Sequence, residues 1–285
     1  MSLSPPKPTA SQLPPSAAQE PSTTGEQSEV GRTDPPEPLL RLELRNLRHA
    51  STRTFLENVD AATDVANLVE IVLKLLYYPS HRHHGSSATA TSTTSQARPR
   101  PYEPHIPGTR SVTLIPRDMD GVAYTTGLEL DDDHKEIHLS LSYISHVSRS
   151  SKGDKVAVRK ELLGVICHEL VHCFQWTGQG RAPGGLIEGI ADWVRLRAGF
   201  VPPHWKREAG EDVKWDAGYQ TTGYFLDWIE NAYGEGSVRR INEALREHEY
   251  KEHSFWKHLF GKHVSELWTA YAKEVEKQHG SGANA

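Results

Sequence analysis

The chain has 285 residues, with 32 Lys and Arg against 37 Asp and Glu, and a formal net charge of −5 when the histidines are neutral. This length predicts one catalytic domain with additional segments, and the acidic balance argues against a nucleic-acid partner. No apolar run is long enough to span a bilayer, so we expect no membrane partner either.

Residues 1–38 are expected to form a disordered tail. They hold nine of the 18 prolines, together with Ser, Thr, Gln and Glu, and almost nothing apolar. The tail lacks the apolar segment of a secretory leader, which favours an intracellular location without fixing the compartment. The two cysteines, Cys167 and Cys173, lie six residues apart on one predicted helix, where they cannot bridge each other. We interpret them as packing thiols.

The N-terminal half of the domain, from residue 39, is predicted to contain strands and one long helix. Alternation of apolar and polar residues predicts half-buried strands. These strands are expected at 39–47, 111–116 and 136–144. Apolar residues near helical spacing predict a helix over 55–78, and residues 118–126 form a turn-rich connection around Asp120 and Gly121.

Residues 79–107 form a low-complexity stretch of His, Ser, Thr and Ala, followed by Arg and Pro. Strand patterns resume after this stretch, so we interpret it as an insertion in the domain. His81, His83 and His84 lie within it. A short His-rich tract of this kind is only a compositional hint of metal binding.

The motif His168-Glu169-Leu170-Val171-His172 lies in an apolar segment with helical pattern. Two imidazoles four residues apart lie one above the other on a helix and can bind one metal ion. The glutamate beside them is placed to act as general base, which is the arrangement of zinc metallopeptidases.

A third ligand is predicted in the helix that follows. Glu188 comes sixteen residues after His172, and a glycine-rich turn lies between the two helices. A helical hairpin would bring Glu188 over the two histidines and leave the fourth zinc position for water. Asp192, one turn later on the same face, is placed to accept the outer N–H of a ligating histidine.

Each of these residues also has a simpler interpretation. The His pair could be a surface or core pair, and Glu188 and Asp192 could belong to a solvated face. Together, however, they would place unpaired charges beside apolar residues, which is costly unless a cation compensates them. We therefore favour a zinc site.

Three segments of the sequence resemble the basic secretory protein family of plants, fungi and bacteria. They are ICHELVHCFQW, GGLIEGIADWVRLRAGF and WDAGYQTTGYFLDWIE, and the resemblance covers about residues 40–271. It implies a zinc peptidase of the thermolysin-like (gluzincin) group, with the pattern H-E-x-x-H followed by E-x-x-x-D. That pattern falls on His168, Glu169, His172, Glu188 and Asp192. The acidic balance and the missing leader depart from the family's name.

The C-terminal half is predicted to be mostly helical. Helices are expected at 154–176, 185–198, 220–232, 237–247, 254–260 and 265–277, with a disordered end at 279–285. Strands first and helices later predict an α+β, zincin-like fold over 39–278, with a small, mostly antiparallel sheet above the active-site helix. We expect the strand at 136–144 to form the sheet edge, where an extended peptide could pair with it.

The predicted activity is endopeptidase hydrolysis of peptides or proteins with Zn²⁺ as cofactor. Glu169 is the expected general base. Tyr219 is the first candidate for stabilising the oxyanion and His204 the second, although each could instead be an ordinary packing or surface residue. Two alternatives stay open: a non-catalytic zinc-containing binding protein on a peptidase scaffold, and metal-dependent hydrolysis of another bond.

Overall fold

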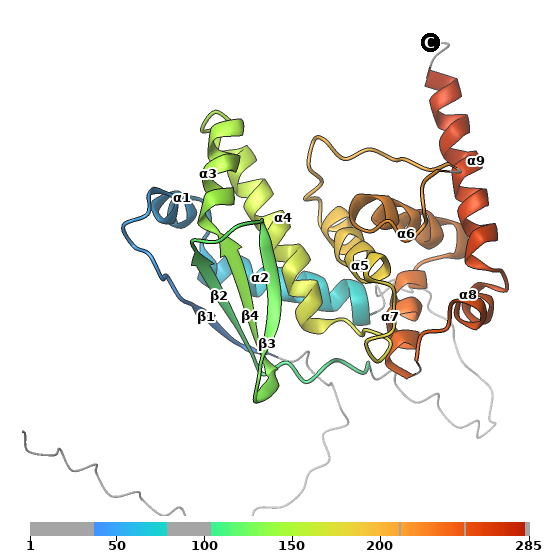
Figure 1. Cartoon of the computed structure of the whole chain (residues 1–285), viewed down its shortest axis with the longest axis horizontal. Helices are drawn as coiled ribbons and strands as arrows, with labels where there is room; N and C mark the ends of the chain where they lie inside the picture. The colour runs from blue at the N-terminus through green and yellow to red at the C-terminus, as the bar shows by residue number, and fades with distance from the viewer. Residues whose placement is uncertain (1–36, 79–103, 211, 248, 283–285) are drawn as a thin grey trace, which may run out of the picture. The chain divides into compact units, whose positions relative to one another are not determined.

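The computed structural model describes residues 37–78, 104–210, 212–247 and 249–282 (Figure 1). Most of the predicted tail at 1–38 and of the predicted insertion at 79–107 lies outside these residues, including His81, His83 and His84. The described residues all belong to one compact unit, 35–285.

The N-terminal half contains a mixed four-stranded sheet. Its strands are β1 (Leu39–Leu42), β2 (Ser111–Arg117), β3 (Ala123–Leu128) and β4 (Asp131–Ser140), in the order β1-β2-β4-β3. The α+β class is confirmed, but the expectation of a mostly antiparallel sheet is wrong. The pairs β1/β2 and β2/β4 are parallel, and only β3/β4 is antiparallel. After β2 the chain crosses to the far edge of the sheet and forms β3. It then turns back to form β4 between β2 and β3, so β4 runs in the same direction as β2.

The prediction that 136–144 forms the sheet edge is also wrong. β4 lies inside the sheet and ends at Ser140, whose side chain accepts a hydrogen bond from the Tyr143 backbone and begins α3 (Leu141–Ser150). The edge strand is β3, which we had assigned to the turn at 118–126. Its sequence, AYTTGL, has few apolar residues, as is typical of a strand that is only partly buried.

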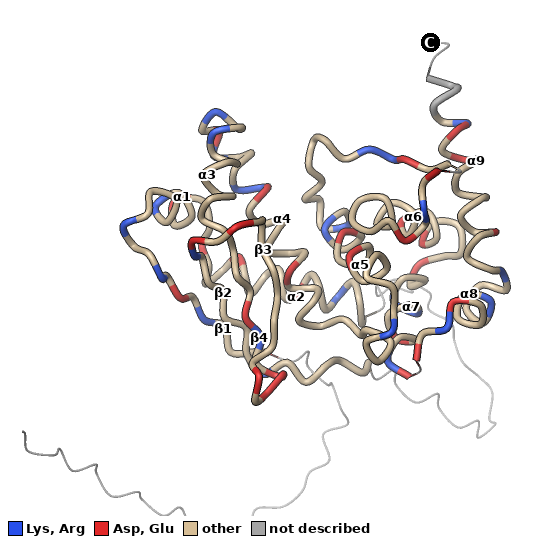
Figure 2. Tube along the Cα trace, viewed as in Figure 1, with Lys and Arg blue, Asp and Glu red and all other residues tan. Residues whose placement is uncertain are grey.

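The β3–β4 turn and the start of β4 are strongly acidic (Figure 2). Glu129 lies in the turn, and Asp131, Asp132 and Asp133 are the first residues of β4. Basic side chains neutralise part of this charge, since Arg110 pairs with Asp131 and Asp133, and Lys135 with Asp132. Charges at the end of an exposed edge strand oppose pairing with the edge of another molecule.

Two helices replace the single predicted helix at 55–78. They are α1 (Ala50–Asn58) and α2 (Ala61–Tyr77). The break occurs because Asp60 caps α2 by accepting from the Thr63 backbone, while the Asp60 N–H donates to Asp64. β1 is likewise shorter than the predicted 39–47, because the chain leaves the sheet after Leu42.

Helix α4 (Lys155–Phe174) lies between the sheet and the helical half (Figure 1). Asp154 caps it by accepting from the Val156 and Ala157 backbones. It packs against α2, α5 (Gly184–Arg197) and the sheet. A helix buried on several sides needs apolar residues around most of its circumference, which explains why apolar residues fill most positions from Leu162 to Phe174.

Four further helices complete the described part of the C-terminal half. They are α6 (Tyr219–Tyr233), α7 (Ser237–Glu247), α8 (Glu252–Phe260) and α9 (Val264–Gly282). They agree closely with the predicted helices, although α9 continues past the expected domain end at 278. None of the helices in the described residues combines the length and hydrophobicity that a bilayer span requires.

Helices α5 and α6 approach each other closely through two glycines. A Cβ atom on Gly189 would lie 2.3 Å from Cγ2 of Thr222, and one on Gly223 would lie 3.2 Å from Cβ of Asp192. Thr222 is fully buried, accepts from the Gly218 backbone and donates to the Trp215 carbonyl. Thr222 therefore packs against α5 at Gly189 and also holds the segment that leads into α6.

We predict that Gly189→Ala lowers the free energy of unfolding by about 1–2 kcal/mol. The new methyl group overpacks the contact with Thr222, and the better helix propensity of alanine offsets this only in part. Gly184→Ala is the matched control on the same helix, because no atom lies within 4 Å of its added Cβ. Urea unfolding should show unchanged or slightly higher stability for the control. Equal stability of the two variants would contradict the prediction.

Candidate active site

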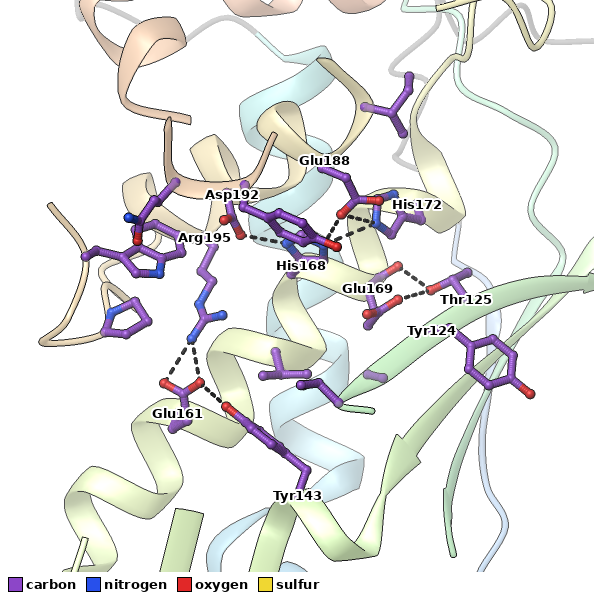
Figure 3. Close-up of a pocket in the computed structure, with 18 of the residues that line it drawn as sticks. Tyr124, Thr125, Tyr143, Glu161, His168, Glu169, His172, Glu188, Asp192 and Arg195 are labelled. Atoms are coloured by element: carbon purple, nitrogen blue, oxygen red, sulfur yellow. Dashed lines mark hydrogen bonds and ion pairs between the residues drawn. The ribbon is translucent and has the colours of Figure 1, made fainter. Parts of the chain in front are cut away.

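A cavity of about 800 Å³ opens along α4 (Figure 3). β3 forms one wall, and α5 with the segment before α6 forms the other. Residues one turn apart on α4 face this space, since an α-helix repeats every 3.6 residues. Those lining the cavity from α4 are Glu161, Val165, His168, Glu169 and His172.

Three of the predicted site residues converge in this cavity. One ligand atom from each of His168, His172 and Glu188 lies within 4.8 Å of the other two. His168 Nε2 is 3.0 Å from Glu188 Oε2 and 3.2 Å from His172 Nε2, and His172 Nε2 is 3.7 Å from Glu188 Oε2. The helical hairpin thus returns the carboxylate to the two imidazoles, as the spacing in the sequence predicted.

These separations fit a tetrahedral zinc site. Ligand atoms about 2.0–2.1 Å from a tetrahedral ion lie about 3.4 Å from one another. The three measured distances, 3.0, 3.2 and 3.7 Å, lie on both sides of that value. Two nitrogens and one oxygen are also a donor set that zinc accepts, and three protein ligands leave one position open.

Asp192 lies behind His168, where it was predicted. His168 Nδ1 is 2.7 Å from Asp192 Oδ1, and Asp192 is only 2% exposed. This hydrogen bond places the proton on Nδ1 and directs Nε2 toward His172 and Glu188. The Asp192 carboxylate therefore fixes the orientation of the His168 ring.

The charges of this group perturb one another. Burial alone would lower the pKa of His168, but the hydrogen bonds to Asp192 and Glu188 outweigh it and raise that pKa to about 9. Hydrogen bonds from His168 and His172 hold the pKa of the Glu188 carboxyl well below its usual range. The protonated form of His168 and the ionised form of Glu188 thus stabilise each other.

Glu169 is held by a residue that the sequence did not single out. The Thr125 hydroxyl lies 2.7 Å from Glu169 Oε2 and 3.0 Å from the Glu169 carbonyl oxygen. Thr125 belongs to β3, so this contact joins the sheet edge to α4 beside the three candidate ligands. Thr125 was missed because β3 was taken for part of a turn, and the Tyr-Thr-Thr sequence of that strand was the available signal.

Tyr219 lies beside the candidate ligands, at the start of α6. Its ring centroid is 6.2 Å from that of His168, with an angle of 16° between the rings, and the residue is 60% exposed. The negative charge of Glu188, together with partial burial, raises the pKa of Tyr219, so the phenol keeps its proton and can donate. His204, the second candidate, lines the same cavity from the segment between α5 and α6.

A second polar group lies farther along the cavity and was not predicted. Arg195 Nη2 is 2.9 Å from both carboxylate oxygens of Glu161, and the Tyr143 hydroxyl donates to Glu161 Oε1 at 2.7 Å. All three residues line the cavity (Figure 3). They come from α3, α4 and α5, three elements whose relative position no spacing in the sequence reveals.

The cysteines take no part in the cavity. Cys167 and Cys173 are both buried and free of disulfide bonds, as predicted. Burial raises the pKa of the Cys167 thiol to about 12 and also raises that of Cys173. Thiols protonated in this way are poor nucleophiles and poor metal ligands, so they are packing residues.

Comparison with known proteins gives one positive finding. A family model described as peptidase of plants and bacteria matches residues 37–271, which include the whole cavity described above. No curated protein and no solved structure matches the chain significantly. Because the match covers most of the sequence, the chain belongs to the BSP family, the peptidases of plants and bacteria.

Proposed function

We propose that this protein is a zinc-dependent endopeptidase whose metal ligands are His168, His172 and Glu188. The observation that carries the proposal is the spacing of the three ligand atoms, which brackets that of a tetrahedral zinc site. Membership of a peptidase family supports peptide or protein substrates. The retained Glu169 favours catalysis over a structural site, because a closed structural site has no use for a general base.

A bound zinc ion would supply Lewis-acid chemistry, polarising the scissile carbonyl and lowering the pKa of water at the open position to about 7. Glu169 then takes a proton from the attacking water and delivers it to the departing amine. Thr125 restrains the Glu169 carboxylate during both transfers. Asp192 holds the His168 ring in the tautomer that leaves Nε2 free to bind.

Tyr219 is our candidate for stabilising the oxyanion that forms on the scissile carbonyl. Its phenol is protonated and stands beside the His168 ring, so it can donate a hydrogen bond as negative charge develops. The position of Tyr219 depends on Gly218 and Thr222, since the Gly218 N–H donates to the Thr222 hydroxyl immediately before α6 begins.

An extended substrate would lie along β3. From the sequence we had instead expected it to lie along the strand that is β4. β3 is the outer strand of the described sheet on the cavity side, and Val122, Ala123, Tyr124 and Thr125 line the cavity. Backbone hydrogen bonds to such an edge hold a peptide regardless of its sequence, while pockets select side chains. This arrangement supports cleavage within a chain, because it requires no terminal group.

The first prediction is that Glu169→Gln abolishes hydrolysis but keeps the metal. The amide preserves the shape of the side chain and removes only the base, so kcat should fall by about 10²–10⁴-fold or more. Zinc content after dialysis should equal that of the wild type. Cleavage of casein or a quenched peptide at the wild-type rate would rule out the assigned role.

A second prediction separates the ligand from its neighbour. Asp192→Asn should weaken zinc binding by about 10–100-fold, because it loosens only the support of His168. Glu188→Gln removes a ligand and should weaken binding further. Glu129→Gln, on the exposed β3–β4 turn, is the control and should bind zinc normally. If Glu188→Gln keeps full affinity by chelator competition, another group must be the third ligand.

A third prediction concerns pH. The pKa of His168 is raised from 6.5 to about 9 in the metal-free protein, so the proton stabilises the fold fully below pH 6.5 and this contribution is lost as the pH rises through 9. Zinc must displace that proton. Its affinity should therefore rise about tenfold per pH unit between pH 6 and 8. Titration calorimetry in buffers of different ionisation enthalpy should detect proton release, and a flat pH profile would contradict it.

A further inference from the structure

The Tyr143–Glu161–Arg195 group occupies the cavity wall at a distance from the three candidate zinc ligands. Glu161 precedes His168 by seven residues on α4, and Arg195 follows Glu188 by seven residues on α5. Seven residues correspond to about two helical turns, or about 10 Å. A substrate held at the zinc ligands would therefore reach this group with a side chain close to the scissile bond.

The guanidinium of Arg195 is rigidly held. Its Nε donates to the Phe200 carbonyl at 3.1 Å, its Nη2 binds Glu161, and its Cζ lies 5.3 Å from the Trp205 ring centroid. Helix α4 leaves space for it, because a Cβ on Gly164 would lie only 2.8 Å from Nε. These contacts hold the group in place before any ligand arrives, which lowers the entropic cost of binding.

One end of this guanidinium remains available. Arg195 is only 7% exposed, yet its Nη1 has no hydrogen-bond partner among the described residues, while Nε and Nη2 both have one. This nitrogen is not one of the fully buried polar atoms without a partner, so it faces the cavity, where an acceptor on a ligand can reach it. A second cavity of about 710 Å³ shares Tyr143 and Glu161 with the first, so the space continues beyond this group.

A purely structural role explains the group less well. Replacing a buried ion pair with apolar residues of similar size is often neutral or stabilising, so stability alone gives little reason to keep one. Here the pair lines the cavity that holds the candidate catalytic residues. Glu161 neutralises the charge of Arg195, which leaves the free N–H groups able to bind a neutral acceptor as well as an anionic one.

We infer that Arg195, held by Glu161 and Tyr143, forms a substrate subsite for a side chain that ends in an oxygen acceptor, namely the amide of glutamine or the carboxylate of glutamate. The inference rests on the proposed function for the position of the peptide. The subsite should prefer such side chains over aliphatic ones. A pocket lined only by apolar residues would instead favour aliphatic side chains.

Peptide binding to the full-length Glu169→Gln protein loaded with zinc tests the inference without hydrolysis. The probes are fluorescein-labelled alanine-rich peptides with one variable residue, either Gln, Glu, Leu or Lys. Fluorescence anisotropy should show the Gln and Glu peptides binding at least tenfold more tightly than the Leu and Lys peptides. Tightest binding of the Leu peptide, or no measurable binding of any peptide, would overturn the subsite.

The decisive variant adds Glu161→Met and Arg195→Met together, because removing both partners avoids a lone buried charge. We expect the order to invert, with the Leu peptide now bound at least threefold more tightly than the Gln peptide. Misfolding cannot produce such a gain. Lys155→Met is the control, since Lys155 lies on the same helix but is exposed and away from the cavity, and its order of affinities should match the parent's. The same order in parent and double variant refutes the inference.

Arg195→Lys provides a second test if the double variant is unstable. It keeps the charge and loses the second terminal nitrogen, so the Gln and Glu peptides should bind at least threefold more weakly while the Leu peptide is unchanged. Equal weakening of all peptides would speak against the subsite. Cleavage by the wild type is measured separately. Selective binding without cleavage would refute the peptidase proposal alone, and cleavage without side-chain preference would refute the subsite alone.

Discussion

The return of α5 onto α4 is the constraint on which the candidate site depends. Glu188 and Asp192 lie on one face of α5, and His168 and His172 on one face of α4, so one contact between these helices brings all four together. The close approach of α5 to α6 at Gly189 and Gly223 holds α5 from its other side. Shifts of a few tenths of an ångström there would be transmitted to the ligand atoms, because tightly packed helices do not deform independently.

The sheet contributes to the site through its edge. β3 lies against α4, and Thr125 joins the two elements at Glu169, the proposed base. The same strand forms the cavity wall along which a peptide can lie. The strand that positions the base is therefore also the strand that would position the substrate. Polar contacts to α4 thus hold an edge strand that has little apolar content.

Buried charge is distributed unevenly along the cavity. At one end, two imidazoles and two carboxylates lie close together, and His168 and Glu188 shift each other's pKa values through their hydrogen bond. At the other end, Glu161 and Arg195 neutralise each other and leave donors free. Charges in low-dielectric surroundings need compensation, either from an ion or from a ligand. We therefore assign the first end to the proposed metal and the second to the proposed substrate subsite.

The amino-acid sequence alone identified the candidate ligands and the candidate general base, and it predicted the helical half of the fold. His168, Glu169 and His172 are neighbours on one helix, and Glu188 and Asp192 on the next, so their geometry follows from helical periodicity over short separations. The helices of the C-terminal half were predicted for the same reason.

Tertiary structure decided the sheet order, the edge strand and the Tyr143–Glu161–Arg195 group. β3 and β4 differ in burial only because of the strands placed beside them, and alternation within a strand does not reveal its neighbours. The break between α1 and α2 depends on the local cap at Asp60, which a continuous apolar pattern conceals. Thr125 and Arg195 gain their roles from contacts over 44 and 34 residues of chain, which only folding brings about.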